Sequence, residues 1–192
     1  MSTVAAIVLA AGLGTRMGGP KALLEVDGES LLRRHVARFA ELGARVFVVT
    51  RGAYADAVTE ILPRGAARLV IGDTASPADS LQLAVRSAQL EANELVFVTP
   101  VDVRPASAAT LHALRAAMQA AVLAATPQYR AHGGHPVLLR AEALRAYDTG
   151  EPLPLRNHLQ ALGRRRIRVL VDDPNVERDF DVPSDLQATA QR

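Results

Sequence analysis

The stretch Leu9-Ala10-Ala11-Gly12-Leu13-Gly14-Thr15-Arg16-Met17-Gly18-Gly19-Pro20-Lys21 carries the strongest structural signal in this chain. It directly follows the apolar run Val4–Leu9, which is typical of a buried parallel strand that ends in a loop. Its four glycines lack Cβ atoms, so backbone N–H groups can approach phosphate oxygens and point at them together. Arg16 and Lys21 add two positive charges. We therefore predict that this loop binds a nucleoside triphosphate.

Two other phosphate-binding patterns do not fit the loop. The dinucleotide pattern G-x-G-x-x-G requires a sixth-position glycine, and Met17 stands there. The P-loop pattern requires Gly-Lys followed by Ser or Thr, and the chain contains no such triplet. An ordinary tight turn after a strand is the structural alternative. The glycines and the two cations together favour the phosphate-binding interpretation over that turn.

Outside this loop, apolar strand-like runs alternate with helical apolar spacing through the first 125 residues. The expected strands are Val4–Leu9, Val46–Val49, Leu69–Ile71, Leu95–Val98, Val122–Ala125, Val137–Leu139 and Ile167–Val171. The expected helices are Ser30–Leu42, Ala53–Leu62, Pro77–Leu90, Ser107–Gln119, Ala141–Tyr147, Leu155–Leu162 and Ser184–Thr189. The alternation predicts an α/β fold with a mostly parallel sheet between helices on both faces. Since no linker or repeat interrupts it, we expect residues 1–192 to form a single domain.

The composition narrows the class of protein. The chain has 192 residues, of which 49% are hydrophobic and only 4% are aromatic, so the expected core is aliphatic. The absence of cysteine excludes disulfides, thiolate metal sites and a cysteine nucleophile. The chain begins without a basic segment typical of a signal peptide, and no apolar stretch approaches the roughly 18 residues of a membrane span. We expect a cytoplasmic protein that binds no membrane.

The net charge is +2, and one basic run stands out, Arg164-Arg165-Arg166-Ile167-Arg168. The run lacks the interleaved aromatic residues that stack on nucleic-acid bases, so we expect no nucleic-acid partner. It is more typical of a solvated turn before a strand. The alternative is an anion-binding role near the active site.

Aspartates stand at two positions suited to metal binding. Asp102 comes just after the expected strand Leu95–Val98, and ligands of open parallel sheets bind at the carboxyl ends of strands. Asp179 and Asp181 are two apart, so in an extended segment both would face one site. Carboxylate oxygens suit Mg²⁺, which also bridges to substrate phosphates. A turn or capping role is the alternative for Asp102, and Asp185 fits the first turn of the last helix.

The loop, continued by Pro20-Lys21-Ala22-Leu23-Leu24, resembles the signature of the nucleotidyltransferases with a glycosyltransferase-A-like fold. These include sugar-phosphate nucleotidyltransferases and the molybdenum cofactor cytidylyltransferases and guanylyltransferases, which are MobA-like NTP transferases. The resemblance implies a Rossmann-type three-layer α/β/α fold of the nucleotide-diphospho-sugar transferase kind.

The resemblance also implies roles for individual residues. Nucleotide contacts are expected from Leu9, Ala10, Ala11, Gly12, Gly14, Thr15, Arg16, Lys21 and, in Asp79-Ser80-Leu81, from Ser80. Pro100-Val101-Asp102 matches the metal-binding strand end of the family, and Asp179-Phe180-Asp181-Val182-Pro183 resembles its Asp-Ile-Asp-Thr-Pro segment. We expect Mg²⁺ on Asp102 and Asp181, with Asp179 as the alternate ligand. Arg16, Lys21 and Asp102 are the expected catalytic residues.

Several segments favour the cytidylyltransferase branch. Gly133-Gly134-His135-Pro136-Val137-Leu138-Leu139 looks like its Gly-His-Pro-Val-Leu segment, and Pro154–Leu159 resembles the segment that follows. We therefore expect His135 to contact the acceptor, with a structural role as the alternative. The guanylyltransferases carry Ala-Gly-Gly where this chain has Ala-Ala-Gly, and the methyl of Ala11 would narrow the base pocket toward a pyrimidine. Gly19-Pro20-Lys21 looks more like the sugar-nucleotide enzymes, which leaves the acceptor open.

The expected reaction is attack by an acceptor phosphate on the α-phosphorus of CTP, with release of pyrophosphate. The expected acceptor is the molybdenum cofactor molybdopterin, with a molybdoenzyme as a further partner. Sugar-phosphate or phospholactate nucleotidyl transfer and a GTP-using guanylyltransferase are the alternatives among enzymes. A non-catalytic nucleotide-binding chaperone that delivers the cofactor is the alternative of another class. The first half of the chain would bind the nucleotide and the second half the acceptor.

Overall fold

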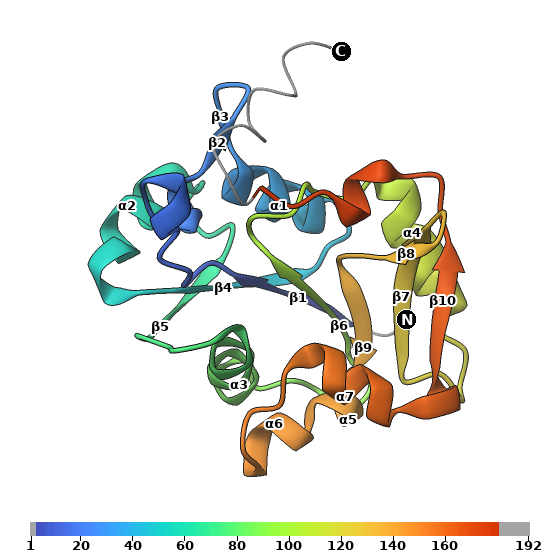
Figure 1. Cartoon of the computed structure of the whole chain (residues 1–192). Coiled ribbons are helices and arrows are strands. Elements are labelled where there is room, and N and C mark those ends of the chain that lie inside the picture. The colour runs from blue at the N-terminus through green and yellow to red at the C-terminus, as the bar shows by residue number, and fades with distance from the viewer. Residues whose placement is uncertain (1–2, 181–192) are drawn as a thin grey trace.

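A twisted sheet runs through the middle of the molecule (Figure 1). The computed structural model describes residues 3–180 of the chain. The strands of the sheet lie in the order β10-β7-β9-β6-β1-β4-β5, with the short β8 paired to β7. Their bounds are β1 Val4–Leu9, β4 Arg45–Thr50, β5 Arg68–Ile71, β6 Leu95–Pro100, β7 Ala124–Tyr129, β8 His132–Gly133, β9 Val137–Arg140 and β10 Arg166–Leu170. A separate ribbon joins β2 Glu25–Val26 to β3 Glu29–Ser30.

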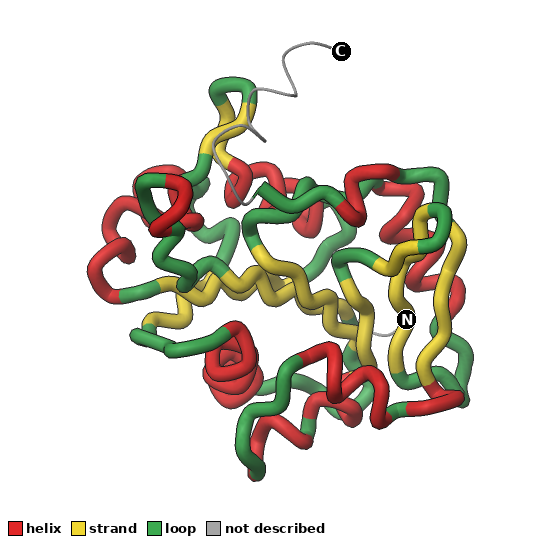
Figure 2. Tube along the Cα trace, in the orientation of Figure 1, coloured by secondary structure: helices red, strands yellow, loops and turns green. Residues whose placement is uncertain are grey.

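Helices cover both faces of the sheet, which confirms the predicted three-layer α/β arrangement (Figures 1 and 2). One face carries α1 Leu31–Ala40, α2 Ala55–Ile61 and α4 Ala108–Ala117. The other face carries α3 Pro77–Ala88, α5 Ala141–Leu144, α6 Ala146–Thr149 and α7 Leu155–Ala161. No helix among residues 3–180 is long and apolar enough to cross a membrane.

The two core layers follow from strand alternation, because successive side chains point to opposite faces. In β1, Ala6 and Val8 pack into the layer shared with α1, α2 and α4. Ala5 and Ile7 pack into the layer shared with α3, α5, α6 and α7. Both cores are mainly aliphatic, as the composition predicted. A strand that is apolar on both sides belongs in the centre of a parallel sheet.

The sheet is mostly parallel, as predicted, but β9 runs antiparallel to both of its neighbours, β6 and β7. After β7 the chain reverses at Arg130, which adopts a left-handed φ of 51°, and forms the hairpin with β8. The reversed strand β9 then fills the space between β6 and β7. This insertion carries His135 to the carboxyl end of β6, where ligands of such sheets bind.

One predicted helix is divided in two, and another lies outside the described residues. The segment predicted as one helix, Ala141–Tyr147, is two short helices, because the chain turns at Arg145 and Tyr147 is directed into the core instead. The Tyr147 hydroxyl donates a hydrogen bond to the Leu153 carbonyl at 2.8 Å, which ties α6 to the segment before α7. The predicted last helix, Ser184–Thr189, lies outside the described residues.

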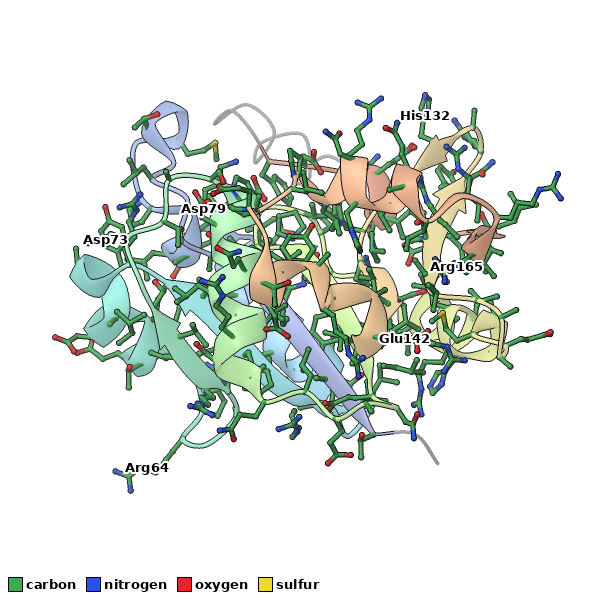
Figure 3. All side chains as sticks on the ribbon, turned by 90° about the horizontal axis from the view of Figure 1, so that it is seen from below. Arg64, Asp73, Asp79, His132, Glu142 and Arg165 are labelled. Atoms are coloured by element: carbon green, nitrogen blue, oxygen red, sulfur yellow. The ribbon has the colours of Figure 1, made fainter. Side chains whose placement is uncertain are left out.

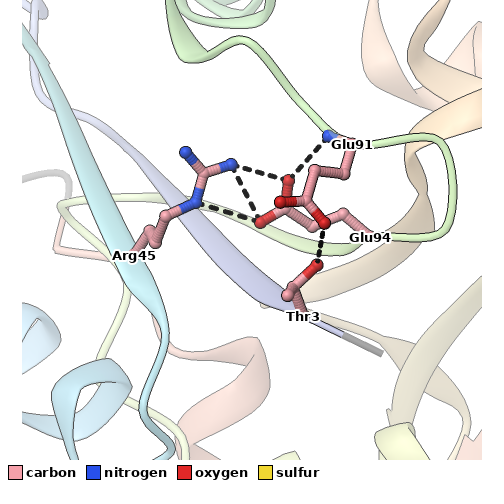
Figure 4. A network of polar contacts seen from close by, with 4 residues as sticks. All are labelled: Thr3, Arg45, Glu91 and Glu94. Carbon is pink, nitrogen blue, oxygen red and sulfur yellow. Dashed lines mark hydrogen bonds and ion pairs between the residues drawn. The ribbon is translucent and has the colours of Figure 1, made fainter. Parts of the chain in front are cut away.

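The amino ends of the central strands are tied by one buried carboxylate (Figure 4). Glu94, just before β6, has a fully buried side chain and accepts hydrogen bonds from Arg45 on β4 at 2.8–3.2 Å. It also accepts the backbone N–H of Glu91 at 3.1 Å, while Thr3 donates to the Glu91 carboxylate. This network lies at the end of the strands opposite to the glycine loop, so it serves the sheet and not the candidate site.

Candidate active site

The glycine loop closes tightly on itself after β1. Gly14 has a φ of +59°, and a Cβ built on it would lie 1.9 Å from the carbonyl oxygen of Gly19. Met17 N–H donates to the Gly14 carbonyl at 2.8 Å, and Lys21 N–H donates to the Gly12 carbonyl at 3.2 Å. Position 14 therefore requires glycine for both its backbone angle and its close approach. The return of the chain brings Lys21 back across the start of the loop.

An ion pair joins this loop to the end of β6. The Lys21 ammonium contacts the Asp102 carboxylate directly, and both side chains are mostly buried. Val101 N–H donates to the Leu9 carbonyl at 3.1 Å, which holds the carboxyl ends of β1 and β6 together. The two expected catalytic side chains Lys21 and Asp102 therefore meet at one point.

A second carboxylate reaches the same place from near the end of the described chain. Asp179 pairs with Val103 as an antiparallel bridge, and Phe180 N–H donates to the Asp102 carbonyl at 2.8 Å. This pairing places Asp179 beside Asp102 in one cleft. Asp181, the expected second metal ligand, lies outside the described residues. Among residues 3–180, the alternate candidate Asp179 is the one that the fold brings to Asp102.

The cleft has a volume of about 420 Å³ and opens at the carboxyl ends of the strands. Its lining includes the predicted residues Leu9, Ala11, Gly12, Gly14, Thr15, Lys21, Ser80 and Asp102. Ala10 does not line it, because its side chain alternates to the opposite side and is fully buried in the core with α1. The Arg16 side chain lies outside the described part of the structure.

The wall opposite the loop is the segment that leads into α3. Ser76 caps this helix, accepting the Asp79 N–H at 3.2 Å and donating to the Asp79 carboxylate at 2.9 Å. Ser80 is buried, and its hydroxyl bonds the Thr74 hydroxyl at 2.6 Å and the Ser76 carbonyl at 3.1 Å. Ser80 thus lines the cleft while its hydrogen bonds brace the wall. Asp73 and Asp79, which flank this turn, are labelled in Figure 3.

Arg51 is a cleft residue that the sequence interpretation missed. Its guanidinium donates to the Ala11 carbonyl at 3.0 Å and to the Thr74 carbonyl at 2.8 Å, and it lies 3.5 Å from the Asp73 carboxylate. One planar side chain therefore ties the glycine loop to the opposite wall. Arg51 directly follows β4, so the strand-end rule that identified Asp102 would also have identified it.

His35 supports the end of β6 from the α1 side. The imidazole is 2% exposed, and its Nε2 hydrogen-bonds the Val103 carbonyl at 2.7 Å. Burial lowers the pKa of His35 to about 4, against the opposing effects of backbone carbonyls and the charge of Asp102. His35 is therefore neutral at pH 7, and a carbonyl partner requires that Nε2 carry the proton. It anchors the residue next to Asp102.

His135, the expected acceptor residue, lies between β8 and β9. Its N–H donates to the Val176 carbonyl at 2.7 Å, and a Cβ on Gly134 would lie 1.9 Å from that same oxygen. Burial lowers the pKa of the His135 imidazole, while a hydrogen bond with the Val98 carbonyl and the charge of Asp102 raise it. His135 lines a second cleft and not the one that holds Lys21.

The carboxylates of the cleft suit a cation that is bound partly by the protein and partly by substrate phosphates. Among residues 3–180, no three His, Cys, Asp or Glu side chains gather as a metal cage. Asp102 and Asp179 provide carboxylates from two segments of one cleft. Mg²⁺ commonly takes one or two protein carboxylates and completes its octahedron with waters and substrate phosphates. The residues present therefore fit a magnesium–triphosphate complex.

The profile of the MobA-like NTP transferase domain matches residues 6–178. A solved nucleotidyl transferase from Methanothermobacter thermautotroptrophicus, Mth528, is 25% identical with a TM-score of 0.79, covering 98% of this chain and 96% of that one. A 61-residue stretch is 46% identical to the bifunctional IPC transferase and DIPP synthase of Thermococcus kodakarensis. That stretch is 31% of this chain and 14% of that protein.

Two further solved structures share the fold at lower identity. One is the manganese complex of Rv0371c from Mycobacterium tuberculosis, 20% identical with a TM-score of 0.75 and 97% coverage of both chains. The other is the 2-C-methyl-D-erythritol 4-phosphate cytidylyltransferase of Francisella tularensis, 15% identical with a TM-score of 0.77. The latter match covers 98% of this chain and 99% of that chain. Both matches show that this chain shares their fold.

Proposed function

This chain belongs to the MobA-like NTP transferase family, and from that membership we propose that it transfers CMP from CTP to a phosphate-bearing acceptor, releasing pyrophosphate. The observation that carries this proposal is the meeting of Lys21 with Asp102 beside Asp179. A site that only binds nucleotide has no need for carboxylates from two distant segments. Catalysis at such a site combines a cation for phosphate with carboxylates for a metal.

The proposed chemistry needs positioning and charge neutralisation more than proton transfer. The acceptor phosphate is already an anion, so it attacks the α-phosphorus of CTP without a strong general base. The new bond forms between the acceptor oxygen and the α-phosphorus, while the bond to the β-phosphate oxygen breaks and pyrophosphate leaves. Amides of the glycine loop, with Arg16 and Lys21, hold the triphosphate. In this step Lys21 exchanges its contact with Asp102 for phosphate oxygens.

We propose Mg²⁺ as the divalent ion, held by Asp102 and by Asp179 or Asp181. When bound, the ion supplies Lewis-acid polarisation of the α-phosphoryl group and alignment of the acceptor. The manganese complex of Rv0371c, which shares the fold, supports a divalent ion. Asp102 would then serve two partners, Lys21 before substrate binds and the cation afterwards.

The choice of CTP rests on the base pocket. Ala11 lines the cleft, is 6% exposed and has its carbonyl held by Arg51, so its methyl group limits space where the base would lie. A pyrimidine fits this limit better than a purine. The fold shared with a cytidylyltransferase agrees with this choice. GTP is the alternative, and the nucleotide screen below separates the two.

For the acceptor we propose molybdopterin, on the resemblance of the Gly133–Leu139 segment to the molybdenum cofactor cytidylyltransferases. The second candidate is an acceptor of the sugar-phosphate kind. It is favoured by Gly19-Pro20-Lys21 and by the local match to a protein named as an IPC transferase. In both cases residues 1–192 act as one domain, with the nucleotide on the first half and the acceptor on the second. We propose a cytoplasmic location.

The test is pyrophosphate release by the purified full chain with Mg²⁺ and each of CTP, GTP, UTP and dTTP. Each nucleotide is paired with molybdopterin, with a panel of sugar phosphates and with phospholactate. We expect CTP to give the highest kcat/KM with one acceptor class. A higher kcat/KM with GTP would contradict the base-pocket argument. No release with any pair would contradict nucleotidyl transfer and favour a cofactor-delivery role.

A further inference from the structure

The basic run noted in the sequence divides into two parts in the structure. Arg164 and Arg165 lie in the exposed turn Gly163–Arg165, where Arg165 is labelled in Figure 3. Arg166 and Arg168 follow on β10, two residues apart, so both point to one face of the sheet. That face is the one covered by α3 and α7, because their pairing partners are Ala124, in that core layer, and Thr126. The solvated-turn interpretation therefore holds for only half of the run.

Arg166 and Arg168 line a second cleft of about 390 Å³. Arg156 of α7 lines it too, so three guanidinium groups share one cavity. Within residues 3–180, no carboxylate lines this cleft or pairs with any of the three arginines. Burial, followed by the charge of Arg168, lowers the pKa of the Arg166 guanidinium. Uncompensated positive charge around a cavity favours an anionic ligand that offers bidentate oxygen atoms.

The second cleft adjoins the first across β6 and β9. Val98 of β6 pairs with Val137 of β9, and the His135 imidazole hydrogen-bonds the Val98 carbonyl, so His135 lies near the carboxyl end of β6. Pro100 lines the cleft with Lys21 and Asp102, whereas His135 lines the arginine cleft. The two clefts therefore meet at the carboxyl end of β6. Since His135 is kept neutral by burial, it separates the clefts without adding charge.

The strand order gives the length of a molecule that would reach both clefts. From β6 the strands run β9, β7 and β10, and adjacent strands are about 4.8 Å apart, so β6 and β10 are roughly 14 Å apart. Across these strands Arg166 is level with Val96, and Asp102 lies six residues beyond Val96, roughly 20 Å further along the strand direction. The Cα atoms of Arg166 and Arg168 are thus on the order of 20 Å from that of Asp102, so only an extended acceptor reaches both clefts.

We propose that the arginine cleft, formed by Arg156, Arg166 and Arg168, binds a second oxyanion at the far end of the acceptor. This inference rests on the proposed function, since it assumes that the acceptor phosphate attacks beside Asp102. The acceptor is then a small molecule with a phosphate at one end and a phosphate, carboxylate or molybdenum–oxygen group at the other. The first cleft selects the nucleotide, and the arginine cleft selects the acceptor by its distal charge.

A binding experiment tests the cleft without turnover. The full chain, saturated with CTP to occupy the first cleft, is titrated separately with inorganic phosphate, molybdate and succinate while backbone amides are followed by NMR. We expect at least one probe to shift the amides of Thr126, Gly133 and Gly134 in a saturable way. The probe that binds most tightly identifies the class of oxyanion. If none of the three probes shifts these amides, the proposal is wrong.

Matched double variants provide the control. Both arginines of R156Q/R168Q are exposed, so the change should leave the melting temperature within a few degrees of the parent. We expect this variant to lose at least tenfold in affinity for the best probe. R164Q/R165Q removes the same charge from the adjacent turn and should bind as the parent does. Equal loss in both variants would indicate a general charge effect and would overturn the assignment.

Kinetics then connect the cleft to transfer. With an active acceptor, R156Q/R168Q should raise the KM for that acceptor at least tenfold while the KM for CTP changes less than twofold. An unchanged acceptor KM would overturn the role in acceptor binding, even if probes bind. Should no acceptor support transfer, the proposed function fails while the NMR result still judges the anion site.

Discussion

Lys21 and Asp102, 81 residues apart in the sequence, form the ion pair that joins the glycine loop to the end of β6. In the proposed reaction, Lys21 would bind the anionic phosphates and Asp102 would bind the metal cation. The ion pair brings these two groups together. Because each partner holds the other in place, the cleft presents both in position before substrate arrives. Pre-positioned charge is the main source of rate enhancement expected at such a site.

The first prediction concerns this pair. Lys21→Ala and Asp102→Asn should each lower kcat for pyrophosphate release by roughly 100-fold or more, the scale found when one charge-stabilising group is removed. The Asp102 variant should also require a higher Mg²⁺ concentration for half-maximal rate. Arg64→Ala, an exposed charge change far from the cleft, is the control and should keep the parent rate. Parent-like Mg²⁺ dependence in Asp102→Asn would refute the metal role of that carboxylate.

The second prediction compares two glycines of the loop. Gly14→Ala forces a Cβ against the Gly19 carbonyl, so the loop must open, and we expect CTP affinity to fall more than tenfold. Gly18 also has a positive φ, +77°, but a Cβ there meets nothing within 4 Å. Gly18→Ala should therefore show only backbone strain, about 1–2 kcal/mol of stability, and a much smaller loss of affinity. Calorimetric titration with CTP measures both, and equal losses would show that close approach is irrelevant.

The third prediction concerns Arg51. Lysine at this position keeps the charge but lacks the planar fork that bonds the Ala11 and Thr74 carbonyls together. Arg51→Lys should raise the KM for CTP about tenfold and leave kcat within about threefold, because the loop is positioned less firmly. Steady-state kinetics separate the two parameters, with Arg64→Lys as the control. A fall in kcat at unchanged KM would place Arg51 in the chemical step instead.

The fourth prediction follows from the buried imidazole of His35. Its folded pKa of about 4 lies below the unfolded value of 6.5, so the unfolded chain binds the proton first. The stability contribution is complete above pH 6.5 and is lost as the pH falls toward 4, by about 3 kcal/mol. Urea unfolding at pH 7.0, 5.5 and 4.5 should show a smaller decline for His35→Gln than for the parent. Parallel declines would contradict the neutral, buried state of His35.

The fifth prediction concerns the sheet and not the site. Glu94→Gln removes a fully buried carboxylate from Arg45 and should lower the free energy of unfolding by about 2 kcal/mol, discounted because Arg45 is half exposed. Glu91→Gln affects an exposed bond with Thr3 and should cost under about 0.5 kcal/mol. Chemical denaturation measures both. Since Glu94 lies at the opposite end of the strands, the kcat of the folded variant should remain that of the parent.

The sequence predicted those parts of the site that depend on short-range pattern. The glycine loop follows from composition within a few residues, and Asp102 follows from its place at a strand end. Both line the cleft that the structure shows. Ala10 was predicted to contact the nucleotide as its neighbours do, but its side chain points to the opposite side and packs in the core. That outcome depended on which face of β1 each helix covers, which residue types alone do not determine.

Contacts between segments far apart in the sequence determined the rest of the candidate site. The backbone bridge from Val103 to Asp179 brings that residue beside Asp102, across a separation of 76 residues that its own segment does not predict, while Asp181 lies outside the described residues. The reversed direction of β9 likewise depends on the hairpin at Arg130, so the neighbours of His135 were not predictable from its own segment. The basic run was ambiguous for the same reason. Arg164 and Arg165 lie in an exposed turn, whereas Arg166 and Arg168 line a cleft, and this difference depends on the direction in which the side chains of β10 point.

The pairing of Asp179 with Val103 also sets the order in which the protein becomes competent. The glycine loop, β6 and Asp102 are all synthesised long before residue 179 leaves the ribosome. A nascent or truncated chain that lacks this segment carries the glycine loop with one carboxylate fewer beside it. The second carboxylate arrives only when the late segment has aligned against residues 102–104. Incomplete chains would therefore lack one of the carboxylates proposed to hold the metal.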